Sequence, residues 1–250
     1  MESMDPLLAA LFFLVAVLYT TVGHAGASGY LAVMGLTGVA PEVMRPTALL
    51  LNIAVASFTT WRFRAARFFD ARALLPFAAA SIPCAFIGGS IRLPSQLYQG
   101  AVGAVLLASA TLLVWRAYSP RFQGGERAVR VPLLPALAIG GTIGLLSGLT
   151  GTGGGIFLSP VILLAGWAGP KATAGIAAPF IMVNSMAGLA GSTLAAPDLP
   201  ESMFAYAACA LAGAFVGTWL GTRKLQPRAL IVTLAVVMTI AGAKLVARAL

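Results

Sequence analysis

Thr150-Gly151-Thr152-Gly153-Gly154-Gly155 is a glycine cluster in the middle of an apolar segment. Residues 133–149 before it predict a membrane helix, and residues 156–167 after it predict a second, shorter one. Each glycine costs a helix roughly 1 kcal/mol relative to alanine, so the cluster predicts a break. A break at membrane depth persists only where it is buried in protein or lines a wet cavity. The helix that restarts near Gly155 would direct free N–H donors and a positive dipole end at the break, which suits an anion.

The composition predicts an all-α polytopic membrane protein. The chain has 250 residues, of which 59% are hydrophobic and 9% charged, and no run alternates as a membrane β-strand would. The formal charge of +9 comes from short loops between spans, so cytoplasmic loop bias explains it and nucleic-acid binding is not expected. Cys84 and Cys209 lie in apolar segments and read as small buried side chains, so no metal or cofactor is expected. The first apolar run lacks a basic start, which predicts that it is not a cleaved signal peptide.

A second interrupted segment opens the chain. The apolar run 7–22 would be about 24 Å long as a helix, which is short for a full crossing. It stops at the sequence GHAGASG, residues 23–29, and resumes to about residue 36. Gly23–Ala27 lies opposite Gly151–Gly155 at an offset of 128 residues, and Asn52 lies opposite Asn184 at an offset of 132. This correspondence predicts two repeats, residues 1–118 and 132–250, joined by a cytoplasmic linker at 119–131; the alternative is chance similarity of two glycine-rich segments.

Loop charge selects between two topologies. If both broken segments crossed the membrane fully, the basic loops at 62–72 and 223–228 would fall on opposite sides, against the cytoplasmic bias. If each segment returns to its own side as a re-entrant hairpin, most of the 16 basic residues face the cytoplasm, and Asp198 and Glu201 lie outside with the N-terminus. Three full spans in each half then give the halves opposite orientations. We therefore expect an inverted repeat, each half being a re-entrant broken-helix hairpin plus three transmembrane helices, in a bacterial inner membrane.

The polar residues within the apolar segments are the candidates for a substrate site. All seven acidic residues lie near segment ends or in loops, which disfavours a carboxylate proton relay, a cation site or acid–base catalysis inside the membrane. Asn52 and Asn184 lie near the centres of their spans. Their amides are expected to face the substrate, one from each half; the alternative is a helix-to-helix hydrogen bond worth about 0.6 kcal/mol.

The breaks contribute further candidates. His24 would either contact the anion or donate to a freed helix carbonyl. Ser28, Thr150 and Thr152 could donate hydroxyl groups, although such residues are also common at tight helix contacts. The full set of expected substrate-binding residues is His24, Gly26, Ala27, Ser28, Asn52, Thr152, Gly153, Gly154, Gly155 and Asn184.

Residues near the proline-bearing turns have alternative explanations. Arg45 and Lys171 could draw anions towards a vestibule, and surface solvation is the alternative for each. The prolines within apolar segments are expected to mark helix starts or kinks: Pro46, Pro160 and Pro179.

These features resemble the TauE/SafE family of sulfite exporters, which are anion permeases for sulfite, sulfoacetate and related anions. The resemblance covers nearly the whole chain and depends on Gly151–Gly155 followed by Pro160, on Asn184-Ser185, and on the duplicated half. The first half departs from the family pattern, because the run from His24 to Ser28 stands where another glycine-rich run would be expected. That departure bears on the substrate, since His24 and Ser28 would change the donors in the site.

Together these observations predict a carrier for a small oxyanion or organosulfonate, held near the midplane between two hairpin tips. The resemblance alone implies export. Two alternatives are a passive anion channel and a membrane-embedded enzyme, and one histidine without mid-span carboxylates disfavours the enzyme. The expected partners are a small anion and membrane lipid. The sequence leaves open the coupling ion, the choice between rocking and elevator motion, and whether the protein forms a homo-oligomer.

Overall fold

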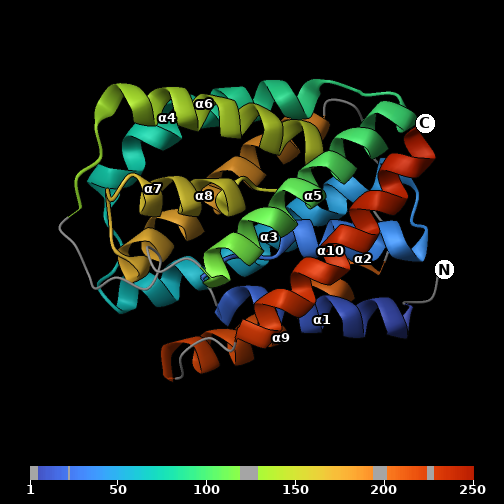
Figure 1. Ribbon diagram of the computed structural model, residues 1–250, viewed down its shortest axis with the longest axis horizontal. Helices are drawn as coiled ribbons and strands as arrows, with labels where there is room; N and C mark the ends of the chain where they lie inside the picture. The colour runs from blue at the N-terminus through green and yellow to red at the C-terminus, as the bar shows by residue number, and fades with distance from the viewer. Residues whose placement is uncertain (1–4, 22, 119–128, 194–201, 224–227) are drawn as a thin grey trace.

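A computed structural model of the chain describes residues 5–21, 23–118, 129–193, 202–223 and 228–250 (Figure 1). The regular elements in this part of the chain are all α-helices. The predicted acidic turn at 197–201 and most of the linker at 119–131 lie outside the described residues. The helices are α1 Pro6–Thr21, α2 Ala27–Thr37, α3 Pro41–Ala65, α4 Ala71–Ser90, α5 Ser95–Tyr118, α6 Leu133–Thr150, α7 Gly155–Leu164, α8 Pro170–Thr193, α9 Met203–Arg223 and α10 Arg228–Ala249.

Both predicted breaks are present, since α1 and α2 are separate helices and so are α6 and α7. The main difference from the expected elements is the start of α3, which begins at Pro41 rather than near residue 47. Proline is favourable in the first turn of a helix, where its missing N–H costs nothing, and Glu42 beside it suits the positive end of the helix dipole. Pro46 therefore lies inside α3, and Pro160 and Pro179 lie inside α7 and α8.

Six of the described helices are long and apolar enough to cross a membrane: α3, α4, α5, α6, α8 and α9. Five of them are among the spans that the sequence predicted; α6 takes the place of α10. The α6 segment Leu133–Thr150 has 18 residues and no charged side chain, whereas α10 carries Lys244 and Arg248. The first arm of the second broken segment is thus as long as a full span.

Each broken segment enters and leaves at one end of the molecule. We name the two ends by the starts of α3 and α4, the Pro41 end and the Ala71 end. The tip of α1–α2 lies at the Ala71 end, where Gly23 packs against Ala174 at the start of α8. The tip of α6–α7 lies at the Pro41 end, where Gly151 packs against Arg45. The two segments therefore point in opposite directions, as Figure 1 also shows for α1 and α6.

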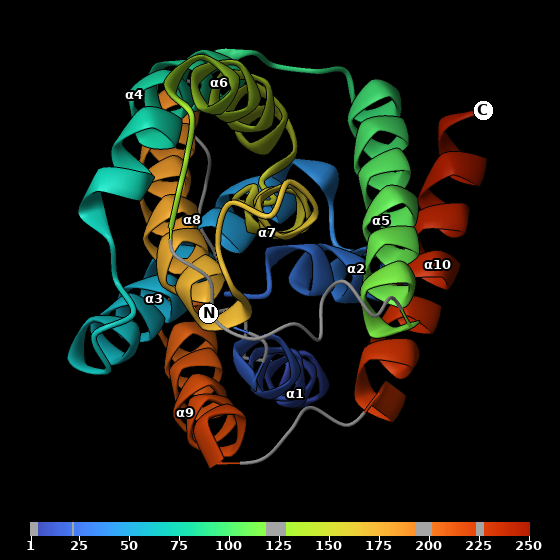
Figure 2. The ribbon, with the colours of Figure 1, turned by 60° about the vertical axis from the view of Figure 1, so that its left-hand side comes forward.

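The long helices surround the two short ones. Figure 2 shows α2 and α7 in the interior, with α5 and α10 side by side on one flank and α3, α8 and α9 on the other. Every residue from Ala27 to Gly35 of α2 is buried. Lys244 Nζ on α10 donates to the carbonyl of Leu36, at a distance of 2.7 Å, so a cation holds the negative end of the α2 dipole.

Glycine allows the closest helix pairs to approach backbone to backbone. On α6, Gly140, Gly144 and Gly148 lie against the backbone of α4. On α9, Gly213 and Gly217 lie against the backbone of α1 in the same way. Small residues spaced four apart are typical of membrane helix interfaces, because lipid supplies no hydrophobic drive for association and close van der Waals packing must do so.

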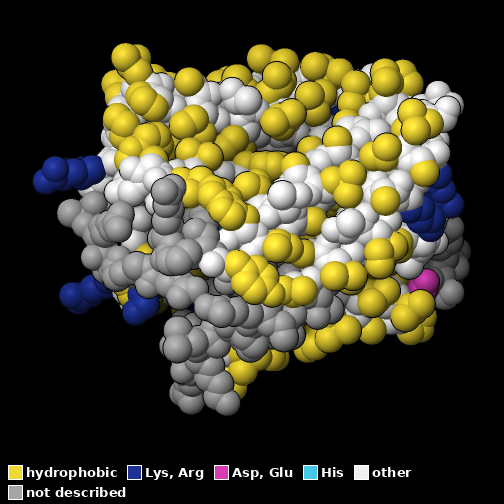
Figure 3. All heavy atoms as spheres, viewed as in Figure 1, with side chains coloured by type: hydrophobic (Ala, Val, Ile, Leu, Met, Phe, Trp, Pro, Cys, Tyr) yellow, Lys and Arg dark blue, Asp and Glu magenta, His cyan; other side chains and the backbone are white. Residues whose placement is uncertain are grey.

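The surface matches a membrane setting. Figure 3 shows hydrophobic side chains spread over the middle of the visible face, with the visible lysines and arginines at the two ends of the molecule. Large apolar side chains such as Phe204, Leu134 and Phe215 are exposed along the helices. A soluble protein would bury such residues, whereas lipid solvates them.

Candidate functional site

The two breaks share their backbone geometry. Helix α2 begins after Gly26 and helix α7 begins after Gly154, and both glycines are left-handed, with φ of 105° and 77°. Neither cap supplies a side-chain acceptor to the first N–H groups of its helix, although both helix starts are buried. A buried helix start without a cap is uncommon in proteins, and such starts bind anions readily.

Left-handed glycines recur at one spacing along the chain. The pairs are Gly23 with Gly151, Gly26 with Gly154, and Gly38 with Gly166, and the members of each pair are 128 residues apart. This is the offset that the sequence comparison gave for the breaks. Gly153 has no such partner, because Ala25 stands at the equivalent position.

His24 joins the first break to the second. Its Cδ2 atom lies 3.7 Å from the position that a Cβ atom on Gly155 would occupy. The side chain is buried, and its backbone N–H donates to the carbonyl of Tyr19 at 3.0 Å. The structure therefore brings the predicted residues His24 and Gly155 together, at the start of α7.

Asn52 lies beside the second break. Its Nδ2 donates to Ser185 Oγ on α8, 3.3 Å away, and a Cβ atom on Gly153 would collide with the same amide nitrogen. The amide thus makes the helix-to-helix bond that was the alternative explanation, and it also contacts the glycine cluster. The sequence did not mark Ser185 as a site residue. Its only signal was its place next to Asn184.

Asn184 is turned towards its own helix. Its Nδ2 donates to the carbonyl of Phe180 at 2.9 Å, and the side chain is fully buried. The amide oxygens of Asn184 and Asn52 are both buried without a hydrogen-bond partner. The expectation that both amides face one ligand stays a prediction.

The hydroxyl groups of the breaks are held by local partners. Ser28 Oγ lies 2.6 Å from Tyr19 Oη, which also reaches Met238 Sδ at 3.2 Å. Thr152 Oγ1 lies 3.1 Å from Thr150 Oγ1. No sequence spacing pointed to Tyr19, because its contact with Ser28 depends on how α1 and α2 pack.

Several buried polar atoms close to the breaks have no partner. They lie on the helices that form or flank the breaks, and they include Tyr30 Oη, Thr47 Oγ1, Ser147 Oγ, Ser159 Oγ and Thr173 Oγ1. Buried polar groups are nearly always hydrogen-bonded in proteins, and each exception needs an explanation such as a ligand or water. A polar, hydrated substrate path would provide one.

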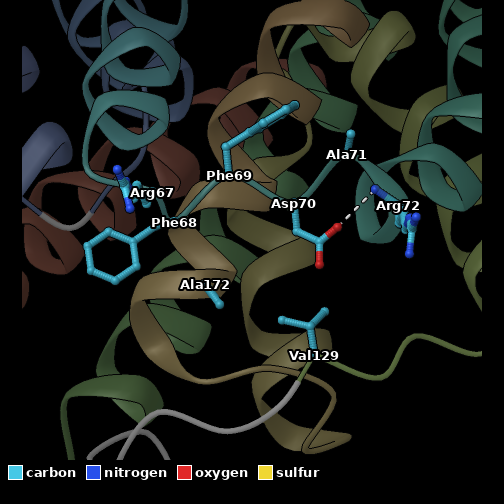
Figure 4. Close-up of a pocket in the computed structure, with 8 residues that line it drawn as sticks. All are labelled: Arg67, Phe68, Phe69, Asp70, Ala71, Arg72, Val129 and Ala172. Atoms are coloured by element: carbon cyan, nitrogen blue, oxygen red, sulfur yellow. Dashed lines mark hydrogen bonds between the residues drawn. The ribbon is translucent and has the colours of Figure 1, made fainter.

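A separate cavity of about 450 Å³ lies at the turn between α3 and α4 (Figure 4). Asp70 is in its wall, and its Oδ1 accepts from the N–H groups of Arg72 and Ala73, which caps α4. The ammonium of Lys171 lies nearby over the ring of Phe68, 5.4 Å from its centre. A carboxylate in the wall disfavours an anion, so this cavity is not the candidate site.

Comparison with known proteins identifies the relatives of the chain. The family model described as sulfite exporter TauE/SafE matches residues 8–245. The chain is 36% identical over 242 residues to the "Probable membrane transporter protein y4hK" of Sinorhizobium fredii, an alignment that covers 95% of this chain and 96% of that protein. No solved structure matches. The chain belongs to the TauE/SafE family of sulfite exporters and is a multi-pass membrane transporter.

Proposed function

We propose that the protein exports small anions such as sulfite or organosulfonates as a secondary transporter. The observation that carries this proposal is the contact between His24 and Gly155, which joins two buried, uncapped helix starts. Unpaired N–H groups and the positive dipole ends of α2 and α7 would hold the anionic head group. Asn52, Asn184 and His24 would complete the site.

Alternating access would follow from an inverted repeat. If the two halves are related by a two-fold axis, α1 corresponds to α6 and α4 to α9. The packing of α6 on α4 then has its counterpart in the packing of α1 on α9, which supports this relationship. The glycine pairs spaced by 128 residues support it as well. In such transporters one repeat-related bundle moves against the other around a central site.

The charge distribution supports one orientation in a bacterial inner membrane. Arg62, Arg64, Arg67 and Arg72 lie at the Ala71 end, which would face the cytoplasm. The Pro41 end, with the N-terminus, would face outwards. Anions would then leave the cell past the tip of the α6–α7 hairpin.

Uptake into proteoliposomes tests the proposal. We expect saturable uptake of sulfite or an organosulfonate from a panel that also contains taurine, sulfate and a carboxylate, with counterflow when the vesicles are preloaded. A flux that never saturates and shows no counterflow would identify a passive channel instead. Failure of wild-type protein to move any anion of the panel would refute the proposal.

A further inference from the structure

The second break is held at the Pro41 end by residues of α3 and α5. A Cβ atom on Gly151 would lie 3.1 Å from Arg45 Cγ and 3.2 Å from the Arg45 carbonyl oxygen. The hydroxyl of Tyr98 donates to the carbonyl of Thr150 at 3.2 Å. Any anion that passes the hairpin tip at this end therefore passes close to Arg45.

The charge of Arg45 is not compensated by a carboxylate. Its Nη1 donates to the carbonyl of Ile91 at 3.0 Å, and within the described part of the chain its guanidinium forms no ion pair. Glu42, one turn away, accepts instead from the hydroxyl of Ser95 at 2.8 Å. Arg92 lies close enough to repel Arg45. A half-buried cation costs free energy unless something pairs with it, and a guanidinium has five N–H donors to offer.

The other hairpin tip makes the matching contact without a charge. Gly23, 128 residues before Gly151, packs against Cβ of Ala174, which lies 129 residues after Arg45. One tip thus lies against an arginine and the other against a methyl group. Arg45 also lies at the end that is expected to face outwards, where basic residues are disfavoured. Packing alone does not require the charge at this position.

We propose that Arg45 selects and attracts the anion at the Pro41 end of the transport path. This proposal rests on the proposed function and specifies one of its residues. The guanidinium lowers the apparent KM for anions on that side through its field and its planar N–H donors, which match an oxyanion. It does not close the site or hold the anion at the centre.

Salt-dependent kinetics of three variants test this role. Arg45→Gln should raise the KM for the transported anion about tenfold at low ionic strength. The difference should shrink to about twofold or less at high salt, where screening shortens the range of the field. Arg45→Lys should stay within about threefold of wild type, since it keeps the charge. Arg248→Gln, which removes an exposed charge from the last turn of α10, is the control and should not change KM.

Two readouts separate this role from a structural one. A structural role would lower the melting temperature and Vmax of Arg45→Gln equally at all salt concentrations. Arg92→Gln, at an exposed position, provides a second test that does not disturb the hairpin tip, and it should raise KM about two- to threefold at low salt. Wild-type KM in both neutral variants, or equal losses in Arg45→Gln and Arg45→Lys, would overturn the proposal. These outcomes require active wild-type protein, so they are distinct from failure of the proposed function.

Discussion

Gly153 is the residue at which the second break has the least room. Its φ is +72°, and a Cβ atom there would collide with the amide of Asn52 and lie 2.9 Å from Ile181 Cγ2. We expect Gly153→Ala to lose uptake by at least about tenfold, because the left-handed backbone costs about 1–2 kcal/mol and the contact displaces Asn52. Initial uptake rates and melting temperature would measure the two effects.

Gly38→Ala is the matched control for that substitution. Gly38 has a similar φ of +82°, but nothing lies within 4 Å of where its Cβ atom would be. It should therefore pay the backbone strain and keep its transport rate. Equal uptake by the two variants would show that the close approach of Gly153 to Asn52 does not matter for transport.

The two asparagines provide a second prediction at the scale of single residues. Asn52→Ala and Asn184→Ala should abolish uptake while leaving the protein folded, if their amides bind the anion. A double-mutant cycle of Asn52→Ala with Ser185→Ala should give a coupling of about 0.6 kcal/mol, the usual size of a hydrogen bond between membrane helices. Wild-type uptake in either asparagine variant would remove that residue from the site.

Which of these residues could be predicted depended on how local their signals are. The glycine cluster and the central asparagines are unusual within an apolar segment, so the sequence was enough to select them. The contacts of Tyr19 with Ser28, and of Asn52 with Ser185, join residues on different helices. No spacing along the chain gives such contacts, because they depend on helix packing.

At the scale of helices, the packing of α6 on α4 depends on missing side chains. A Cβ atom on Gly144 would collide with the backbone of Ser81, whereas one on the neighbouring Gly141 would make ordinary contacts with Cys84 and Ala80. Gly144→Ala should lower stability by about 1–3 kcal/mol, and Gly141→Ala should be tolerated. Thermal unfolding in detergent measures both. Equal melting temperatures would contradict the packing described above.

The helices themselves were largely predictable, since apolar runs and glycine breaks mark most of their ends. The start of α3 was not, because prolines at 41 and 46 suggested a loop, and both fit within the first turns of the helix. The length of α6 was misjudged in its consequence. Its 18 apolar residues are enough to cross a membrane, yet the chain turns back at Gly151.

For the whole molecule, the predicted topology can be read by cysteine labelling. Ala71 and Gln96 are exposed at opposite ends of the molecule. In a background where the half-buried Cys84 and Cys209 are replaced by serine, Ala71→Cys should react from the cytoplasmic side and Gln96→Cys from the outside. An impermeant maleimide applied to cells and to inverted vesicles distinguishes the two. Labelling of both from one side would contradict the orientation.

The repeat was predictable from the sequence because its strongest marks, the glycines, fall at a constant spacing. The direction of each broken segment was inferred from loop charge, which is a statistical bias of the whole chain rather than a property of any residue. The closeness of His24 to Gly155 could not be derived from either signal. It depends on how far each hairpin penetrates between the long helices.

The interlocked arrangement has a consequence for dividing the chain. The partner of α1 is α9, the partner of α4 is α6, and Lys244 of the last helix caps the end of α2. Fragments cut within 119–131 would each leave a groove that only the other fragment fills. Expressed separately they should be degraded, and expressed together they should reassemble into a working permease.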